Sequence, residues 1–174
     1  MAAQFLINLG HSKIACFTGR LTHQSTLDRS EGFKKALAES GKSVEGVRIL
    51  NKGVHFEDSA ASIVIEWAKK EKMPSAIFAY NDLLAYEIIG TLMELGLSVP
   101  GDVSVLGFDN VRMARYFRPP LTTINQSMET IGKFGAKMLM SLIQGNTLNK
   151  NKITIEPEII IRDSCDKPNL RRIL

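Results

Sequence analysis

Residues 74–85 read PSAIFAYNDLLA and carry the clearest signal of the fold class. Residues 76–80 are apolar on both faces, as expected of a central strand in a parallel sheet that helices cover on both sides. Asn81 follows directly, and asparagine is a preferred residue for capping the N-terminus of a helix. The stretch therefore predicts a buried strand that leads straight into a helix.

The same alternation extends in both directions from this stretch. Apolar runs predict further strands at 14–18, 47–50, 103–108, 121–125 and 153–161, and helical spacing predicts helices at 25–40, 56–72, 82–95 and 127–144. In the helix after Asn81 the inward positions are expected to be Leu84, Ala85, Ile88, Ile89, Leu92 and Leu95. Strand and helix alternate about four times, roughly every 25 to 30 residues, which predicts an α/β fold with a doubly wound, mostly parallel sheet. Pro157 interrupts the last run, so that strand is expected at an edge.

The composition is that of an ordinary globular domain. The chain has 174 residues, of which 44% are hydrophobic and 23% charged, and this is enough for one core. The net charge of +4 is mixed along the chain apart from a basic tail at Lys167, Arg171 and Arg172, which favours a solvated surface over a nucleic-acid site. The first residues do not resemble a signal peptide, and no apolar run reaches the roughly 18 residues of a membrane span. We therefore expect a cytoplasmic protein with no membrane partner.

No motif for metal or catalytic chemistry stands out. Cys16 lies in an apolar run that predicts a reduced thiol in the core, and the only other cysteine is Cys165. Three histidines lack the spacing of metal ligands, namely His11, His23 and His55. Residues 36–43, ALAESGKS, match a relaxed phosphate-loop pattern, but they close a predicted helix where such a loop has to open one. We expect no metal, no cofactor and no enzymatic activity.

Polar residues gather at one edge of the predicted sheet. Open α/β sheets bind ligands beyond the carboxyl ends of their strands, and three loops lie there, at 20–29, 81–82 and 109–110. Arg29 falls in the first turn of a helix, where the helix dipole disfavours a cation. It either pairs with Asp28 or Glu31 on the surface, or its planar fork grips the hydroxyls or carboxylate of a ligand.

Two more residues of these loops have both a structural and a binding interpretation. Asp109 follows directly on a buried strand, where it either makes a turn or helix cap or accepts hydrogen bonds from a ligand. Asn81 is explained as well by helix capping as by binding. A cationic fork and a carboxylate at one sheet edge suit reversible binding of a polar small molecule better than catalysis.

Six motifs follow one another along nearly the whole chain. They are LxxLGHxxIAxxxG at 6–19, RxxGFxxAL at 29–37, PSAIFAYNDLLA at 74–85, VPGDVSVLGFDN at 99–110, PPLTTINQ at 119–126 and IIIRDS at 159–164. In this order and spacing they resemble the LacI/GalR family of bacterial transcription regulators. The resemblance implies a regulatory part like that of periplasmic sugar-binding proteins, in which two α/β lobes clamp an effector and three strands cross between the lobes.

The resemblance also implies roles for particular residues. The positions that would contact the effector are Arg29, Asn81, Asp109, His23, Ser25, His55 or Phe56 as a neighbouring aromatic position, and Gln126. The positions that tend to face the partner of a homodimer are Tyr86, Ile89, Met113 and Phe117, and packing within the chain is the alternative for each of them.

The family pattern divides the chain unequally. Residues 1–125 and 152–165 match the C-terminal lobe, residues 126–151 match a crossover segment and helix that belong to the N-terminal lobe, and residues 166–174 form a tail without a family pattern. The helix-turn-helix that would bind DNA, the hinge helix and the first lobe have no counterpart in this sequence. The helix at 127–144 therefore needs another partner for its apolar face, and we expect it to pack on a second copy or on its own lobe.

Two functions fit these observations. The first is the effector-sensing portion of a LacI-type DNA-binding regulator, which responds to a sugar, a sugar phosphate or a purine-like molecule. The alternative is a periplasmic-type solute-binding protein for sugar uptake, which shares the fold. The sequence upstream of Met1 would separate the two, because one predicts a DNA-binding head there and the other a secretory signal.

Overall fold

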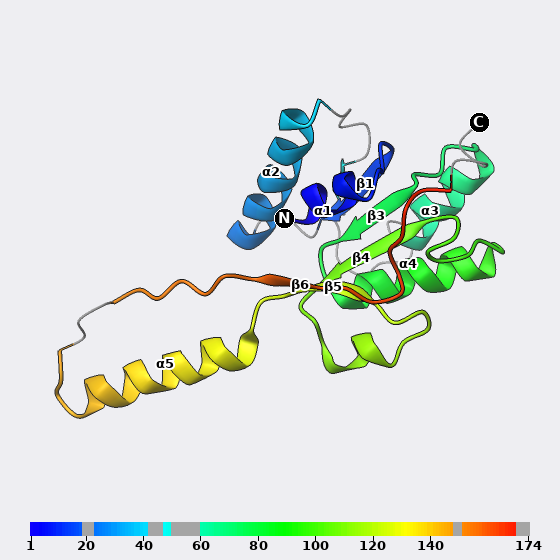
Figure 1. Cartoon of the computed structure of the whole chain (residues 1–174). Coiled ribbons are helices and arrows are strands. Elements are labelled where there is room, and N and C mark those ends of the chain that lie inside the picture. Colours follow the sequence, from blue (N-terminus) through cyan, green and yellow to red (C-terminus); the bar gives the residue numbers. More distant parts are fainter. Residues whose placement is uncertain (19–22, 42–46, 50–59, 148–150, 170–174) are drawn as a thin grey trace.

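The computed structural model describes residues 1–18, 23–41, 47–49, 60–147 and 151–169. In this part of the chain no helix is both long and apolar enough to cross a membrane. The centre is a six-stranded sheet with the order β2-β1-β3-β4-β5-β6 (Figure 1). Its strands are β1 (Ile14–Thr18), β2 (Val47–Ile49), β3 (Ala76–Ala79), β4 (Ser104–Phe108), β5 (Thr122–Asn125) and β6 (Glu158–Ile160).

All neighbouring strands run parallel except β5 and β6, which run antiparallel. The edge position predicted for the last strand is confirmed. The strand is shorter than predicted, because it starts at Glu158, after Pro157, whose nitrogen has no hydrogen to donate to a neighbouring strand.

Helices cover both faces of the sheet, so the doubly wound arrangement is confirmed. They are α1 (Ala2–Asn8) and α2 (Gln24–Glu39) on one face, and α3 (Ala60–Lys69) and α4 (Asp82–Glu94) on the other. Neighbouring residues of a strand point to opposite faces and therefore enter different cores. Phe17 packs with Trp67 of α3 at 5.4 Å between ring centroids, whereas Phe78 stacks on Phe33 of α2 at 5.6 Å.

The buried face of α4 follows the predicted spacing except at its end. Leu84, Ala85, Ile88, Ile89 and Leu92 are buried, but Leu95 is 39% exposed, so its predicted inward position is wrong. The helix ends at Glu94, and Leu95 is the residue that caps it. The helical spacing that places Leu92 in the core no longer applies beyond that point.

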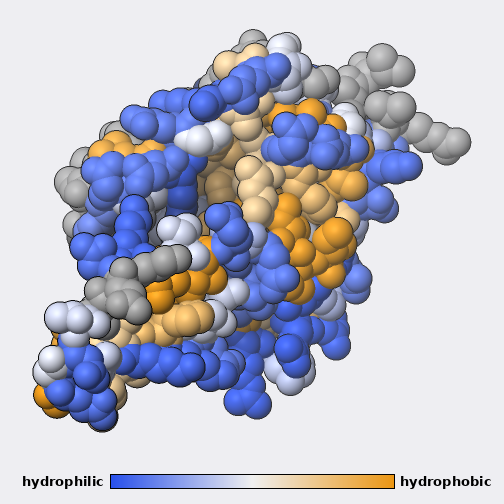
Figure 2. Space-filling view, turned by 60° about the vertical axis from the view of Figure 1, so that its left-hand side comes forward, coloured by the Kyte–Doolittle hydropathy of each residue, from blue (hydrophilic) through white to orange (hydrophobic). Residues whose placement is uncertain are grey.

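The last helix, α5 (Met128–Ile143), lies apart from the rest of the molecule. It projects from the carboxyl end of β5, and the chain returns to β6 along an extended segment (Figure 1). None of its residues is buried, so it does not pack on the lobe of its own chain. Figure 2 brings the left-hand side of Figure 1 forward, and hydrophobic residues are visible there on the surface of the molecule.

Candidate functional site

Arg29 lies half-buried at the carboxyl edge of the sheet. Its guanidinium donates to the backbone carbonyl of Tyr80 at 2.8 Å and lies 3.7 Å from the centre of the Phe108 ring. Burial lowers the pKa of Arg29, and the nearby carboxylate of Asp109 acts in the opposite direction. Arg29 thus turns toward the sheet, and the surface ion pair with Asp28 or Glu31 is not what the structure shows.

Asp109 is held against the same edge by the strand next to it. Its backbone nitrogen donates to the carbonyl of Ile124 at 2.9 Å, and its Oδ1 accepts from Nε2 of Gln126 at 2.7 Å. Burial raises the pKa of Asp109, while Arg29 and the Gln126 hydrogen bond work against that rise. The backbone of Asp109 has a φ of +109°, a conformation that costs a non-glycine residue free energy and that clusters at binding sites.

Asn81 has the structural role that its position predicts. It is the N-cap of α4, and its side-chain oxygen accepts from the backbone nitrogen of Leu84 at 2.9 Å. This hydrogen bond satisfies one of the free N–H groups at the start of the helix. A binding role for the side-chain amide nitrogen of Asn81 stays a prediction.

Of the four remaining positions predicted to contact the effector, two lie in the described part of the chain and two lie outside it. His23 is the N-cap of α2 but makes no capping hydrogen bond through its side chain, and Ser25 stands in the first turn; both are exposed. Ser25 and Arg29 are four residues apart and therefore share one side of α2. His55 and Phe56 lie outside the described residues.

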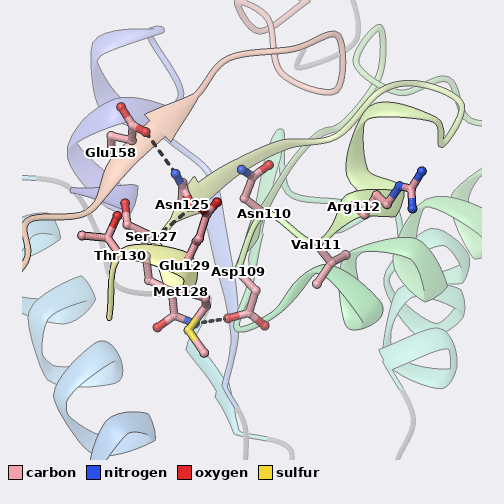
Figure 3. Close-up of a pocket in the computed structure, with 11 residues that line it drawn as sticks. Asp109, Asn110, Val111, Arg112, Asn125, Ser127, Met128, Glu129, Thr130 and Glu158 are labelled. Atoms are coloured by element: carbon pink, nitrogen blue, oxygen red, sulfur yellow. Dashed lines mark hydrogen bonds between the residues drawn. The ribbon is translucent and has the colours of Figure 1, made fainter. Parts of the chain in front are cut away.

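A cleft of about 890 Å³ opens between the end of β4, the end of β5 and the start of α5. Among the side chains that line it, Asp109 and Asn110 follow the end of β4, and Met128 starts α5 (Figure 3). The lining residues are Asp109, Asn110, Val111, Arg112, Asn125, Gln126, Ser127, Met128, Glu129, Thr130 and Glu158. The cleft therefore places two of the predicted contact residues, Asp109 and Gln126, beside the crossover into α5.

Sequence reasoning missed the role of the buried carboxylate of Asp82. Asp82 is completely buried and accepts hydrogen bonds from the backbone nitrogen of Val111 at 2.8 Å and from the hydroxyl of Thr123 at 2.5 Å. A Cβ at Gly107 would collide with this carboxylate, so only glycine leaves room for it. Burial raises the pKa of Asp82, and the two hydrogen bonds limit that rise.

Arg162 supports the same loop from the other side. It donates to the carbonyl of Leu121 at 2.6 Å and to Oδ1 of Asn110 at 2.7 Å, and Asn110 has a φ of +55°. Asp82 and Arg162 together hold the loop that presents Asp109. Both residues stand in motifs that the sequence offers, NDLLA and IIIRDS, but nothing in the sequence says that the motifs meet.

His11 occupies a structural position away from this site. It is buried, and its two ring nitrogens form hydrogen bonds with the hydroxyl of Ser75 at 2.9 Å and the carbonyl of Asp166 at 2.8 Å. Burial lowers its pKa. Within the described ranges no group of three His, Cys, Asp or Glu side chains is placed to hold a metal ion.

The four residues expected at a dimer interface do not behave alike. Met113, in the short 3-10 helix η2 (Arg112–Arg115), is 57% exposed. Tyr86 and Phe117 stack at 4.4 Å between ring centroids and are both half-buried. Ile89 is completely buried in the core of its own chain and has no surface left for a partner, so for this residue intrachain packing is the correct interpretation.

The sheet order, the helices on both faces and the polar side chains at the carboxyl edge of the sheet describe a recognisable class of protein. A family model for the periplasmic binding protein-like domain matches residues 3–165. The chain belongs to this periplasmic-binding-protein-like family, and its similarities place it with the effector-binding portion of LacI/GalR-type transcriptional regulators.

Curated relatives make the comparison more specific. The chain is 36% identical over 170 residues to the HTH-type transcriptional repressor PurR of Vibrio vulnificus, which is 97% of this chain and 50% of the relative. It is 35% identical over 169 residues to PurR of Photobacterium profundum, again 97% of this chain and 50% of the relative. The chain thus spans about half the length of the curated relatives it matches.

Solved structures agree in fold. The dimeric Lac repressor with an 11-residue C-terminal deletion superimposes with a TM-score of 0.84 at 27% identity, over 97% of this chain and 60% of that one. A sugar-binding LacI-family regulator from Escherichia coli complexed with phosphate gives a TM-score of 0.82 at 29% identity, over 96% and 59% of the two chains. The family and fold class expected from the motifs are confirmed.

Proposed function

We propose that this chain is the effector-sensing portion of a LacI-type transcriptional regulator, and that Arg29 and Asp109 hold the effector. One observation carries the site: a cation and a carboxylate lie half-buried together at the carboxyl edge of a parallel sheet, with Asp109 lining an open cleft. Gln126 binds Oδ1 of Asp109, and among the described residues nothing else binds that carboxylate. Within the described part of the chain, Oδ2 of Asp109 and the remaining N–H groups of Arg29 form no hydrogen bond, so we propose that they meet the ligand.

The charges favour a polar effector with neighbouring donors and acceptors. A hydroxyl can donate to Asp109 and accept from Arg29 at the same time, so a sugar, a sugar phosphate or a purine-like molecule fits this pair. Similar proteins are described with such ligands, namely the regulator CelR with cellobiose and a LacI-type protein from Alkaliphilus metalliredigens with D-xylulofuranose. We propose binding without catalysis, since the curated relatives are repressors.

Titration calorimetry with a panel of sugars, sugar phosphates and purines tests the proposal. High ligand concentrations are needed, because one lobe supplies only part of the contacts of a two-lobed clamp. Arg29→Ala and Asp109→Ala should each weaken the best ligand at least about tenfold, the loss of one charge-assisted hydrogen bond. Arg118→Ala is the matched control, since Arg118 is exposed and its hydrogen bonds within the described residues go to carbonyls of its own loop. Unchanged affinity in both site variants would show that the effector lies elsewhere.

The whole regulator is proposed to act in the cytoplasm as a homodimer that binds DNA through a head outside this chain. Exposed Met113 and the stacked pair of Tyr86 and Phe117 support a partner surface on this side of the lobe. Effector binding would then shift the equilibrium between DNA-bound and released states. Sedimentation of Met113→Glu against the unaltered protein tests this surface, and an unchanged dimer would argue against it.

We also propose that residues 126–151 belong to another lobe, while residues 1–125 and 152–165 form this one. The support is that α5 has no buried residue although it carries apolar side chains along its length. Soluble proteins rarely leave such a surface uncovered. The chain spans about half of its curated relatives, so the other half is a sufficient source of cover.

A further inference from the structure

Gln126 joins the candidate ligand pocket to the root of α5. Its Nε2 donates to Oδ1 of Asp109 at 2.7 Å, and it stands between the end of β5 and the start of α5. We infer that the Gln126–Asp109 hydrogen bond sets the direction of α5, which makes Gln126 the positioning residue between the ligand pocket and this helix. The inference rests on the proposed function, because it takes Asp109 as the ligand-binding carboxylate.

The root of α5 is built from local polar contacts. The backbone of Ser127 adopts the left-handed helical conformation, with φ 53° and ψ 48°. Its backbone nitrogen donates to Oδ1 of Asn125 at 3.0 Å. Nδ2 of Asn125 in turn donates to Oε1 of Glu158 at 3.0 Å, on the antiparallel strand β6. The chain therefore changes direction within two residues, and Gln126 is the first of them.

Packing within this chain does not hold α5 in place, because none of its residues is buried. Its direction must then come from its two connections to the sheet. The connection from β5 is the shorter one, since Asn125 ends the strand and Met128 starts the helix. Along this connection, Gln126 is the residue whose side chain reaches back to the sheet edge.

Asp109 is a sensitive anchor for such a link. Its backbone is strained at φ +109°, and its carboxylate is partly removed from water, so it depends on donors supplied by its surroundings. Gln126 is such a donor, beside the positive charge of Arg29. A hydroxyl that donates to the other oxygen, Oδ2, shares the charge of this carboxylate with Gln126 and so weakens the bond between Gln126 and Oδ1. A change at the pocket therefore reaches the backbone at the root of α5.

Distances between spin labels on the lobe and on α5 test this link without any ligand. Suitable label sites are exposed lysines, Lys35→Cys on α2 and Lys137→Cys on α5. The native thiols of Cys16 and Cys165 should stay unlabelled, because burial raises the pKa of each to about 12 and only a thiolate reacts. The readout is the distance distribution from pulsed electron paramagnetic resonance.

Gln126→Ala should broaden and shift the distribution, and Asp109→Ala should do the same. The double variant should add nothing further, since either change already removes the bond. Asp109→Asn keeps an acceptor oxygen and should restore the narrow distribution. Gln144→Ala, at the far end of α5, is the matched control and should leave it unchanged.

A narrow, unshifted distribution in Gln126→Ala would overturn the inference. The inference would also be overturned if Gln126→Ala broadened the distance distribution and Asp109→Ala did not. The anchor of the link would then not be Asp109. Neither result depends on effector binding, whereas the calorimetric comparison of Arg29→Ala and Asp109→Ala tests the ligand site alone. The two failures can therefore be told apart.

Discussion

Helices α4 and α5 carry apolar side chains at similar spacing but differ completely in burial. In α4 the residues Leu84, Ala85, Ile88, Ile89 and Leu92 are buried against the sheet, whereas α5 buries none. We call the sheet with α1 to α4 the body and α5 the arm. The comparison teaches that apolar spacing predicts a helix with a face to bury, but it does not say which surface will bury it.

Because of this difference in burial, the body and the arm contribute differently to the stability of this chain. Removing apolar surface from water contributes about 25 cal/mol per Å². The body gains this contribution on both faces of its sheet within the chain. The arm exposes its large apolar side chains, among them Ile131, Phe134, Leu139 and Leu142, at 41% or more.

The largest effect is expected from the body. Phe17 is completely buried and packs on Trp67, so Phe17→Ala should lower the free energy of unfolding by about 3–5 kcal/mol. Chemical denaturation of the chain measures the change. Phe17→Leu keeps most of the volume and should cost clearly less. A loss below about 1 kcal/mol for the alanine variant would mean that this core does not hold the body together.

The polar support of the site should come next. Asp82→Ala removes the acceptor of a buried N–H of Val111 and a buried hydroxyl of Thr123, and leaving buried donors unpaired costs about 1–3 kcal/mol. Denaturation midpoints of the two proteins give the difference. Asp28→Ala serves as the control, because Asp28 lies near the surface and its carboxylate accepts from Gln24. Equal effects from both aspartates would contradict a special role for the buried one.

A substitution at the ligand edge should have the opposite sign. Asp109 has a φ of +109° and a pKa raised by burial, so Asp109→Gly relieves backbone strain and removes a carboxylate that is costly to keep charged. The chain should gain about 1 kcal/mol after the flexibility of glycine is subtracted, while ligand binding is lost. Glu71→Gly, at φ 52° and away from the site, is the comparison for the backbone effect alone. A destabilised Asp109→Gly would show that the carboxylate stabilises the fold.

A pH-dependent effect is expected at His11, which binds the segment after β6 through the carbonyl of Asp166. Burial lowers the pKa of His11, so between its folded pKa and 6.5 the unfolded chain binds more protons than the folded one. Stability should therefore fall as the pH drops through this window, by at most about 1.4 kcal/mol per pH unit. The slope comes from the burial of His11, and the hydrogen bond to the carbonyl of Asp166 works against it. Unfolding free energies from pH 8 to pH 5 should show it in the native chain, and His11→Gln should not.

Most of the body could be predicted from the sequence because its signals are local. The apolar run of β3 and the cap at Asn81 determine their own elements, and each is confirmed. The last strand is shorter than predicted because apolar residues alone do not show where pairing begins. The inward prediction for Leu95 fails because spacing alone does not show where a helix stops.

The site could be predicted only in part. The positions of Arg29 and Asp109 follow from the rule that ligands bind at the carboxyl edge of a parallel sheet, and the structure brings them together. The contacts of Asp82 with Val111 and Thr123 span 29 and 41 residues, and no local pattern predicts such pairing. The same limit applies to the arm, because the apolar spacing of a helix does not say which surface covers it.

The smallest effect is expected in the arm, and it tests the comparison most directly. Phe134 is 41% exposed, so Phe134→Ala in this chain should change the free energy of unfolding by less than about 0.5 kcal/mol. If residues 126–151 belong to another lobe, the same substitution in a protein that carries that lobe should cost about 3–5 kcal/mol, as Phe17→Ala does here. Denaturation of both proteins supplies the two numbers. A small cost in both would mean that α5 remains uncovered, whereas a large cost already in this chain would mean that a second copy covers it.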